Sequence, residues 1–189
     1  LRMSPRTLVI LTSVLLEAEM NFELDGRKKF ADQMSLVLDQ LPSLADMPAQ
    51  PSRDYVVRLA TWEHDRLQIQ RVRRSVFIEE QQIAERDEWD ELDPVIAHVL
   101  VFEPPASAKR DAVGTGRLEP TGKIGRVAVL PQYRGTGAGV AVMRRLLDLA
   151  AERGFHEVYL NAQVSAAGFY ERLGFRADGP EFDEVGIPH

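Results

Sequence analysis

The sequence contains no cysteine, which excludes disulfide bridges, thiolate zinc sites and a cysteine nucleophile. It has no apolar run near the roughly 20 residues that cross a bilayer, and no low-complexity segment that would predict wholesale disorder. It is not basic, because 23 Lys and Arg face 29 Asp and Glu, which argues against a nucleic-acid-binding surface. Its 189 residues predict one domain with an appendage, and we expect a cytoplasmic protein without a membrane or nucleic-acid partner.

The start of the chain predicts two strands and one helix. Two arginines precede an apolar stretch over residues 8–16, as in a signal peptide, but the alternation that follows at once and the lack of a small-residue cleavage site favour a buried strand. Apolar and polar residues alternate from 17 to 25, which predicts a half-buried strand with a partner at residues 7–11. Helical spacing then predicts an amphipathic helix over residues 30–41, on Phe30, Met34, Val37, Leu38 and Leu41.

This β-β-α extension, residues 1–41, is too small to be stable alone. A proline-rich linker, residues 42–54, connects it to the rest of the chain and is long enough to reach its own domain or a neighbouring subunit. We therefore expect a homodimer in which the extension contributes contacts. Packing of the extension on its own chain is the alternative.

Residues 55–189 show a different pattern, in which a strand meander and crossover helices alternate. This order predicts an α/β or α+β sandwich with helices covering a sheet. We expect helices over residues 137–153, 165–173 and 62–81, the last with an apolar stripe on Leu67, Ile69, Val72, Val76 and Phe77. Strands are expected over residues 55–60, 95–103, 112–119, 124–130, 158–160, 175–176 and 182–185.

The strongest local signal is a glycine-rich turn between a strand and a helix, Val127–Val140. Gly135, Gly137 and Gly139 leave backbone N–H groups unobstructed at a helix N-terminus, which suits a phosphate or pyrophosphate. A Walker loop needs Lys and Ser or Thr after its last glycine, and a dinucleotide fingerprint needs a different glycine spacing, so neither is present. From the glycines alone, a turn without a ligand stays an alternative.

Two motifs around this turn resemble those of the Gcn5-related N-acetyltransferase (GNAT) superfamily. Arg134-x-x-Gly137-x-Gly139, after Val127-Ala-Val129, resembles its acetyl-CoA-binding motif. Residues 169–175, Phe-Tyr-Glu-Arg-Leu-Gly-Phe, are similar to its FYE-x-x-GF segment, and the motifs come in the family's order with a strand between them. Other positions are similar to the small bacterial ElaA/YjcF-like group, namely Val76-Phe77, Glu80-Gln81, Asp87, Asp90, Asp93, His98, Arg126, Leu160, Ala162-Gln163 and Gly186–His189.

The resemblance covers about residues 55–189 and implies the GNAT fold, a mixed sheet split into a V and flanked by helices. It implies acetyl-CoA as cosubstrate, no metal, and direct acetyl transfer to a primary amine of a small molecule or peptide. The cofactor-binding residues that it implies are Val127, Ala128, Val129, Arg134, Gly135, Thr136, Gly137, Ala138, Gly139 and Gln163.

Acetyl transfer requires that the amine lose a proton, that the oxyanion be stabilised and that the negative charge of the departing thiolate be neutralised by a proton donor. The resemblance makes Tyr170 the proton donor to the sulfur, with a packed aromatic residue as the alternative, and the backbone N–H of Val129 a group that polarises the acetyl carbonyl. Gln163 stands where many family members have Asn, and it can still donate and accept hydrogen bonds. No general base can be read, and the candidates are Glu79, Glu80, Glu119, His98 and His189.

Residues 79–93 contain eight acids against Arg86 alone. In the GNAT fold this segment borders the acceptor entrance, so we expect an acidic rim that concentrates a cationic amine, with Glu80 as a substrate-binding residue. A solvated charged loop is the alternative. For the whole chain, the competing hypothesis is a non-catalytic acyl-CoA-binding or sensor module with the same fold.

Overall fold

The computed structural model describes residues 33–38, 53–104, 111–178, 183–184 and 186–188. The two strands predicted before residue 26 and most of the linker therefore lie outside the described residues. So does His189, one of the candidate general bases.

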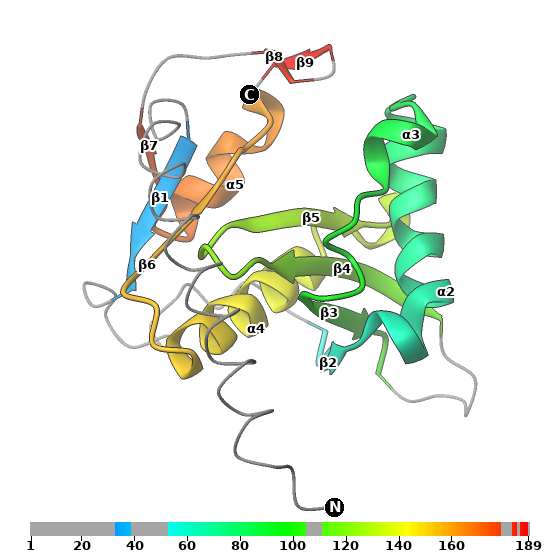
Figure 1. Ribbon diagram of the computed structural model, residues 1–189, viewed down its shortest axis with the longest axis horizontal. Helices are drawn as coiled ribbons and strands as arrows, with labels where there is room; N and C mark the ends of the chain where they lie inside the picture. The colour runs from blue at the N-terminus through cyan, green and yellow to red at the C-terminus, as the bar shows by residue number, and fades with distance from the viewer. Residues whose placement is uncertain (1–32, 39–52, 105–110, 179–182, 185, 189) are drawn as a thin grey trace, which may run out of the picture.

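A four-stranded antiparallel sheet forms the centre of the described structure (Figure 1). Its strands, in spatial order, are β2 (Val56–Ala60), β3 (Ala97–Phe102), β4 (Ala112–Leu118) and β5 (Ile124–Val129), and each lies within a predicted strand. Side chains alternate across a strand, so β3 serves two cores. Val99 and Val101 pack on one side, and Leu100 and Phe102 on the other.

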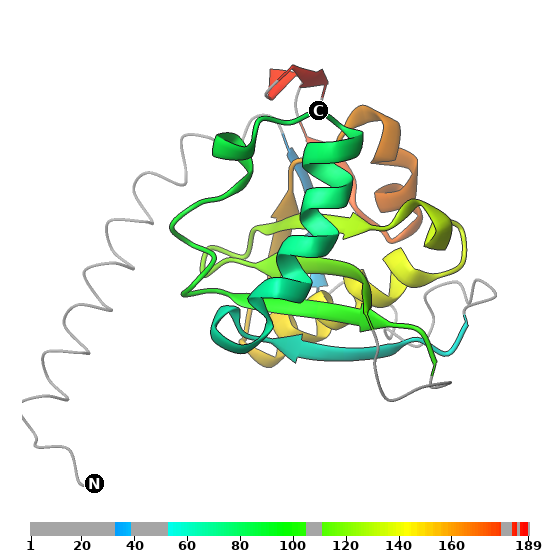
Figure 2. The ribbon, with the colours of Figure 1, turned by 90° about the vertical axis from the view of Figure 1, so that its right-hand side faces the viewer.

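Two helices cover the two faces of this sheet, as the turned view shows (Figure 2). α4 (Ala138–Glu152) lies against β4 because β4 carries glycine where they meet. A Cβ on Gly116 would lie 2.9 Å from the side chains of both Val142 and Leu146, so only glycine allows this close approach. The opposite face is covered by α2 (Trp62–Arg73).

The helix predicted over residues 62–81 is confirmed, although its geometry changes midway. α2 continues into a π-helical segment, η3 (Arg74–Glu80), which is followed by the short helix α3 (Glu85–Glu88). Leu67 does not belong to the apolar stripe as expected, because it is 80% exposed. Ile69 and Val72, by contrast, are fully buried.

A second, three-stranded sheet has the order β6 (Glu157–Leu160), β1 (Gln33–Val37), β7 (Arg176–Asp178). The helix predicted over residues 30–41 is therefore wrong, because residues 33–37 form a strand antiparallel to both neighbours. Met34 and Leu36 alternate into the core, and the backbone groups of β6 and β7 supply hydrogen-bond partners that local spacing cannot reveal. For these residues the alternative, packing on their own chain, is correct.

The two sheets separate like the arms of a V. In the described residues, one parallel bridge between Lys123 and Tyr159 joins β5 to β6, and beyond it the strands diverge. Further short elements complete the fold: η4 (Pro131–Tyr133), η5 (Val164–Ala166), α5 (Ala167–Arg172), β8 (Asp183–Glu184) and β9 (Ile187–Pro188). No helix among the described residues is long and apolar enough to cross a membrane.

Candidate active site

The glycine-rich turn follows β5 and begins α4. Gly135 and Gly137 have φ values of 72° and 97°, in the left-handed region that side chains disfavour. Gly137 is the N-cap of α4 and no side chain caps this helix end, so its first N–H groups stay available to a ligand. A Cβ on Gly135 would meet nothing within 4 Å, so this turn faces open space. The turn therefore has the backbone conformation that an anion cradle requires, and its role in binding phosphate stays a prediction.

The outer edge of β5, at Val129, has backbone groups that are not paired with another strand of the sheet. Val129 stands opposite Gly114 of β4, and the N–H of the next residue, Leu130, donates to Val113 O at 2.9 Å. Because antiparallel partners alternate along a strand, the N–H and C=O of Val129 point away from β4. Its C=O accepts a hydrogen bond from Arg134 Nε at 3.1 Å.

A bulge bends β5 just before this edge. The pairing of β5 with β4 shifts between Thr115 and Arg117, and Arg126 has a φ of 51°. A positive φ in a residue with a side chain costs about 1–3 kcal/mol and persists only where the surroundings enforce it. The side chain of Arg126 is anchored at this bulge, because its Nε lies 3.1 Å from Glu88 Oε2.

A cavity of about 190 Å³ lies in the fork between β5 and β6. Its walls come from the end of η3, from α3, from both strands and from α5. The lining residues are Phe77, Gln81, Ile83, Asp87, Glu88, Lys123, Ile124, Gly125, Arg126, Val127, Leu160, Asn161, Gln163, Ala166, Tyr170 and Ile187. The structure thus brings Tyr170, Gln163 and Val127, three of the predicted site residues, to one cavity.

Tyr170 is held rigidly at this cavity. Its ring packs edge-on against Phe169 and Phe175, with centroid separations of 5.0 and 5.9 Å, and only 8% of the residue is exposed. Burial raises the pKa of Tyr170 to about 12. The phenol therefore stays protonated at neutral pH and can donate a hydrogen bond.

Gln163 is engaged by a partner that the sequence did not suggest. Gln163 Nε2 donates to Gln81 Oε1 at 2.9 Å, and Gln81 Nε2 donates back to Gln163 Oε1 at 3.3 Å. The pair joins the end of η3 to the loop after β6, on opposite walls of the cavity. The adjacent Gln82 has a φ of 60°, which marks the turn that places Gln81.

Arg134, the cation of the predicted phosphate site, is paired with Glu80. Its two terminal nitrogens donate to the two carboxylate oxygens at 2.7 and 2.6 Å. These hydrogen bonds lower the pKa of Glu80, which is therefore ionised at neutral pH. Glu80 is not among the residues that line the cavity, and the ion pair bridges the end of η3 and the glycine turn.

The expectation of an open acidic rim is wrong for most of its residues. Six of the eight acids lie within ion-pair distance of arginine. The pairs are Glu80 with Arg134, Glu85 with Arg74, Asp87 with Arg86, Glu88 with Arg73 and Arg126, Asp90 with Arg117 and Arg126, and Asp93 with Arg73 and Arg117. Most of the negative charge that was expected to attract a cation is therefore balanced within the fold.

The core of this network is a buried ion cluster that sequence reasoning missed. Arg73 has no exposed surface; it contacts the Glu88 carboxylate and donates to Asp93 Oδ1 at 2.6 Å. Arg117 on β4 donates to the same oxygen at 2.8 Å and to Asp90 Oδ2 at 2.7 Å. The cluster ties the acidic segment to the sheet and so fixes the wall of the cavity.

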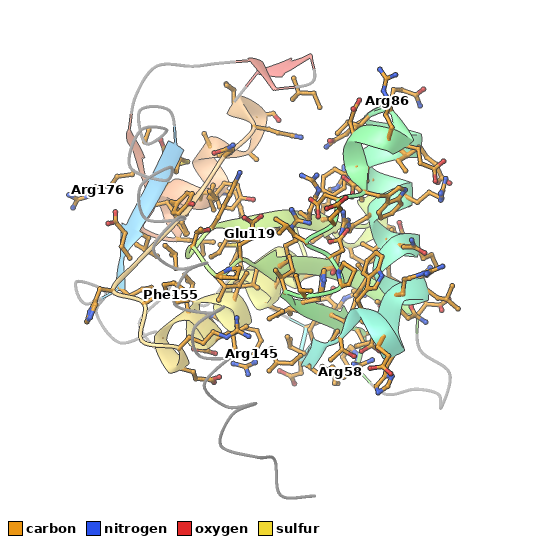
Figure 3. All side chains as sticks on the ribbon, viewed as in Figure 1. Arg58, Arg86, Glu119, Arg145, Phe155 and Arg176 are labelled. Carbon is orange, nitrogen blue, oxygen red and sulfur yellow. The ribbon has the colours of Figure 1, made fainter. Side chains whose placement is uncertain are left out.

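Three of the candidate general bases are accounted for structurally. His98 is 1% exposed, its Nε2 lies 2.8 Å from Asp93 O, and burial lowers its pKa, so it is a core histidine. Glu119, near the centre of Figure 3, pairs with Arg117 at 3.2 Å. Glu80 pairs with Arg134, which leaves Glu79 exposed at the end of η3.

Among the described residues, no cluster of His, Asp and Glu could hold a metal ion.

Comparisons with known proteins agree with this geometry. The acetyltransferase (GNAT) domain family matches residues 98–189. A Bacillus subtilis protein, YyaT, is 37% identical over 139 residues, which cover 70% of this chain and 90% of YyaT. YjcF of the same organism, named an uncharacterized N-acetyltransferase, is 37% identical over 122 residues, 62% of this chain and 84% of YjcF.

A solved structure shows the same fold. The acyl-CoA N-acyltransferase from Pseudomonas aeruginosa superposes with a TM-score of 0.61 at 28% sequence identity, over 72% of this chain and 96% of that one. The chain therefore belongs to the GNAT family of N-acetyltransferases, and the α/β fold predicted for it is confirmed. Membership of this family implies that the chain uses acetyl-CoA and an amine acceptor.

Proposed function

We propose that this enzyme transfers the acetyl group of acetyl-CoA directly to a primary amine that binds in the cavity between β5 and β6. One observation supports the proposal: β5 leads into the glycine turn with its uncapped helix N-terminus, and the same strand lines the cavity that contains Tyr170. A cofactor extended along β5 would have its pyrophosphate at the turn and its thioester beside Tyr170.

The cofactor would be held mainly by backbone groups. Val127 and Val129, on the edge of β5 that faces away from β4, would pair with the pantetheine beside Ala128, whose own backbone groups face β4, and the N–H groups between Arg134 and Gly139 would bind the pyrophosphate at the positive end of α4. Thr136 lies within this turn, where its hydroxyl donates to Tyr133 O at 2.6 Å and lies 2.6 Å from Tyr55 OH. These bonds keep the turn in shape for the phosphates.

Phosphate binding would also change the partner of Arg134. The pyrophosphate carries two negative charges and competes with the Glu80 carboxylate for the same guanidinium. Glu80 would then be free to face the acceptor, which keeps it a candidate substrate-binding residue. The ammonium form of a primary amine is itself cationic, so Glu80 and the exposed Glu79 would be the groups that attract it.

In the reaction, the amine loses a proton to water, its nitrogen forms a bond to the acetyl carbon, and the bond from that carbon to sulfur breaks, with its electron pair leaving on the CoA thiolate. The N–H of Val129 would stabilise the negative oxygen. Tyr170 would donate a hydrogen bond to the departing sulfur. Because an ordinary thiol has a pKa of about 8.5, full proton transfer from a phenol of pKa about 12 is uphill, so hydrogen bonding is the main contribution.

A screen of amines tests this function. The enzyme is mixed with acetyl-CoA and polyamines, aminoglycosides, amino acids or lysine peptides, and free CoA is followed with a thiol reagent. The chain has no cysteine, so it adds no background thiol. Amine-dependent CoA release together with the acetylated amine by mass spectrometry supports the proposal. Tight CoA binding without turnover would favour the non-catalytic acyl-CoA-binding module.

The homodimer stays a prediction, which light scattering can check.

A further inference from the structure

Four charged residues line the cavity, and two of them neutralise each other. Glu88 Oε2 lies 3.1 Å from Arg126 Nε, and the other carboxylate oxygen of Glu88 contacts Arg73. These groups hold the bulge of β5 and the wall of the cavity. The remaining two, Asp87 and Lys123, come from α3 and from the residue before β5.

Lys123 has no counter-charge in the described part of the chain. It is half-buried, and its ammonium forms no ion pair or hydrogen bond with any described residue; its backbone N–H lies 3.4 Å from Thr121 Oγ1. Asp87 does have one, because its carboxylate lies 3.6 Å from Arg86, which is 87% exposed and points outward at the tip of α3 (Figure 3). The lining charge without a partner is thus the ammonium of Lys123.

The backbone of Lys123 is held firmly at the closed end of the fork. Its C=O accepts a hydrogen bond from Glu119 N at 2.9 Å, and the residue forms the bridge to Tyr159 that joins the two sheets. The neighbouring Gly122 C=O accepts from Tyr159 N at 3.2 Å. An ammonium that is carried by a fixed backbone and is partly removed from water favours an anionic partner, since the pair then offsets its desolvation.

We infer that Lys123 binds an anionic group of the acceptor, so that the acceptor is an amine that also carries a carboxylate or a phosphate. This inference rests on the proposed function, because it takes the amine to react near Val127 and Tyr170 at the other end of the cavity. Val127 is four residues after Lys123, at most about 13 Å along the extended chain. The distance suits a molecule whose amine and anion are several bonds apart.

Matched pairs of amines test this specificity. Two pairs differ by a carboxylate, namely 6-aminohexanoate with hexylamine and lysine with cadaverine. A third pair, phosphoethanolamine with ethanolamine, differs by a phosphate, so the set shows which of the two anions is preferred. With the wild-type enzyme, kcat/KM should be about 10- to 100-fold higher for the anionic member of at least one pair, the range of a hydrogen bond to a charged group. Lys123→Met should remove this preference, and Lys123→Arg should retain it.

Arg176→Met is the control, because it removes one positive charge from an exposed side chain on β7, far from the cavity (Figure 3). It should leave the preference unchanged. Equal kcat/KM values within every pair, or a preference that survives Lys123→Met, would overturn the inference while leaving acetyl transfer intact.

If no amine is acetylated, the proposed function fails, and binding decides the inference separately. In the presence of CoA, 6-aminohexanoate or phosphoethanolamine should raise the thermal midpoint of the wild-type protein, and hexylamine and ethanolamine should not. The Lys123→Met protein should show no such difference. Equal midpoint shifts for the two members of each pair, or equal absence of shifts, would overturn it.

Discussion

The glycine-rich turn and the acidic segment 79–93 are equally conspicuous in the sequence, yet the structure treats them differently. The turn has the conformation that its glycines predict, with Gly135 and Gly137 at positive φ and an uncapped helix after them. The acidic segment does not form the open rim that its composition predicts. Its charges are balanced by arginines from α2, β4 and β5, which no local pattern connects to it.

The difference lies in the range of the interactions. Glycine acts on its own backbone, so its effect can be read from a few neighbouring residues. A carboxylate acts according to which charge lies near it after folding, and a buried one needs a partner. The glycines therefore predict the conformation of the turn correctly, whereas the composition of the acidic segment does not reveal its ion-pair network.

The largest effect is expected from Arg73→Met. This change leaves the carboxylates of Glu88 and Asp93 buried without their main partner, and breaking such a pair costs about 3–5 kcal/mol of unfolding free energy. Urea unfolding measures the cost. The control Arg86→Met removes an arginine that is 87% exposed and should change the free energy by less than about 0.5 kcal/mol. Equal stability of the two variants would show that the cluster is not structural.

Gly137→Val should abolish the stabilisation by acetyl-CoA. At a concentration of 100 times Kd the cofactor stabilises the native protein by about 2.7 kcal/mol, and a branched side chain at a φ of 97° distorts the cradle. Thermal unfolding with and without acetyl-CoA measures the loss. Gly154→Val is the matched control, because Gly154 has a φ of 78° in another turn. It should lower the midpoint but keep the shift. A Gly137→Val protein with the full shift would refute the phosphate site.

Tyr170→Phe should lower turnover by about 10- to 1,000-fold, the range of a catalytic hydrogen-bond or proton donor. Affinity for acetyl-CoA should stay nearly unchanged, because the cradle is untouched. Since burial raises the pKa of Tyr170 to about 12, the ratio of wild-type to variant turnover should be constant from pH 7 to 9. Unchanged turnover would show that Tyr170 only packs in the core. A ratio of wild-type to variant turnover that rises with pH would show that the ionised phenolate, and not the phenol, is the active form.

The smallest effect is expected from Glu80→Gln. Removing the competing carboxylate should tighten acetyl-CoA binding by up to about fivefold, because an exposed ion pair is worth about 0.2–1 kcal/mol. Titration calorimetry measures this, with Glu79→Gln as the control. Arg134 lowers the pKa of Glu80, so the carboxylate stays charged and the gain should be the same at pH 6 and 8. Weaker binding in Glu80→Gln would show that the carboxylate orients Arg134 for the phosphate.

Prediction from sequence succeeded where each element contains its own signal. Most strands and helices between residues 56 and 178 lie close to their predicted positions, because alternation and helical spacing persist over whole segments, whereas the short helix α3 (Glu85–Glu88) was not predicted. Tyr170 was found through a motif, and it does line the cavity. Gln81 was missed as the partner of Gln163, because a reciprocal amide pair between distant loops leaves no periodic trace.

The strand at residues 33–37 shows the opposite case. Phe30, Met34, Val37, Leu38 and Leu41 have helical spacing, but Met34 and Leu36 also alternate. The choice between the two patterns depends on the unpaired edges of β6 and β7, which exist only after the rest of the chain has folded. Short amphipathic segments are ambiguous for this reason.

For this protein, local chemistry determined the order of elements, the glycine cradle and the identity of the phenol, since each depends on backbone conformation or on a contiguous motif. The fold decided which charges remain uncompensated. Arg73, Arg117 and Arg126 reach the acidic segment from three elements, whereas Lys123 reaches the cavity without an anionic partner among the described residues. Electrostatic interactions depend on distance in space and on burial, and a linear sequence contains neither.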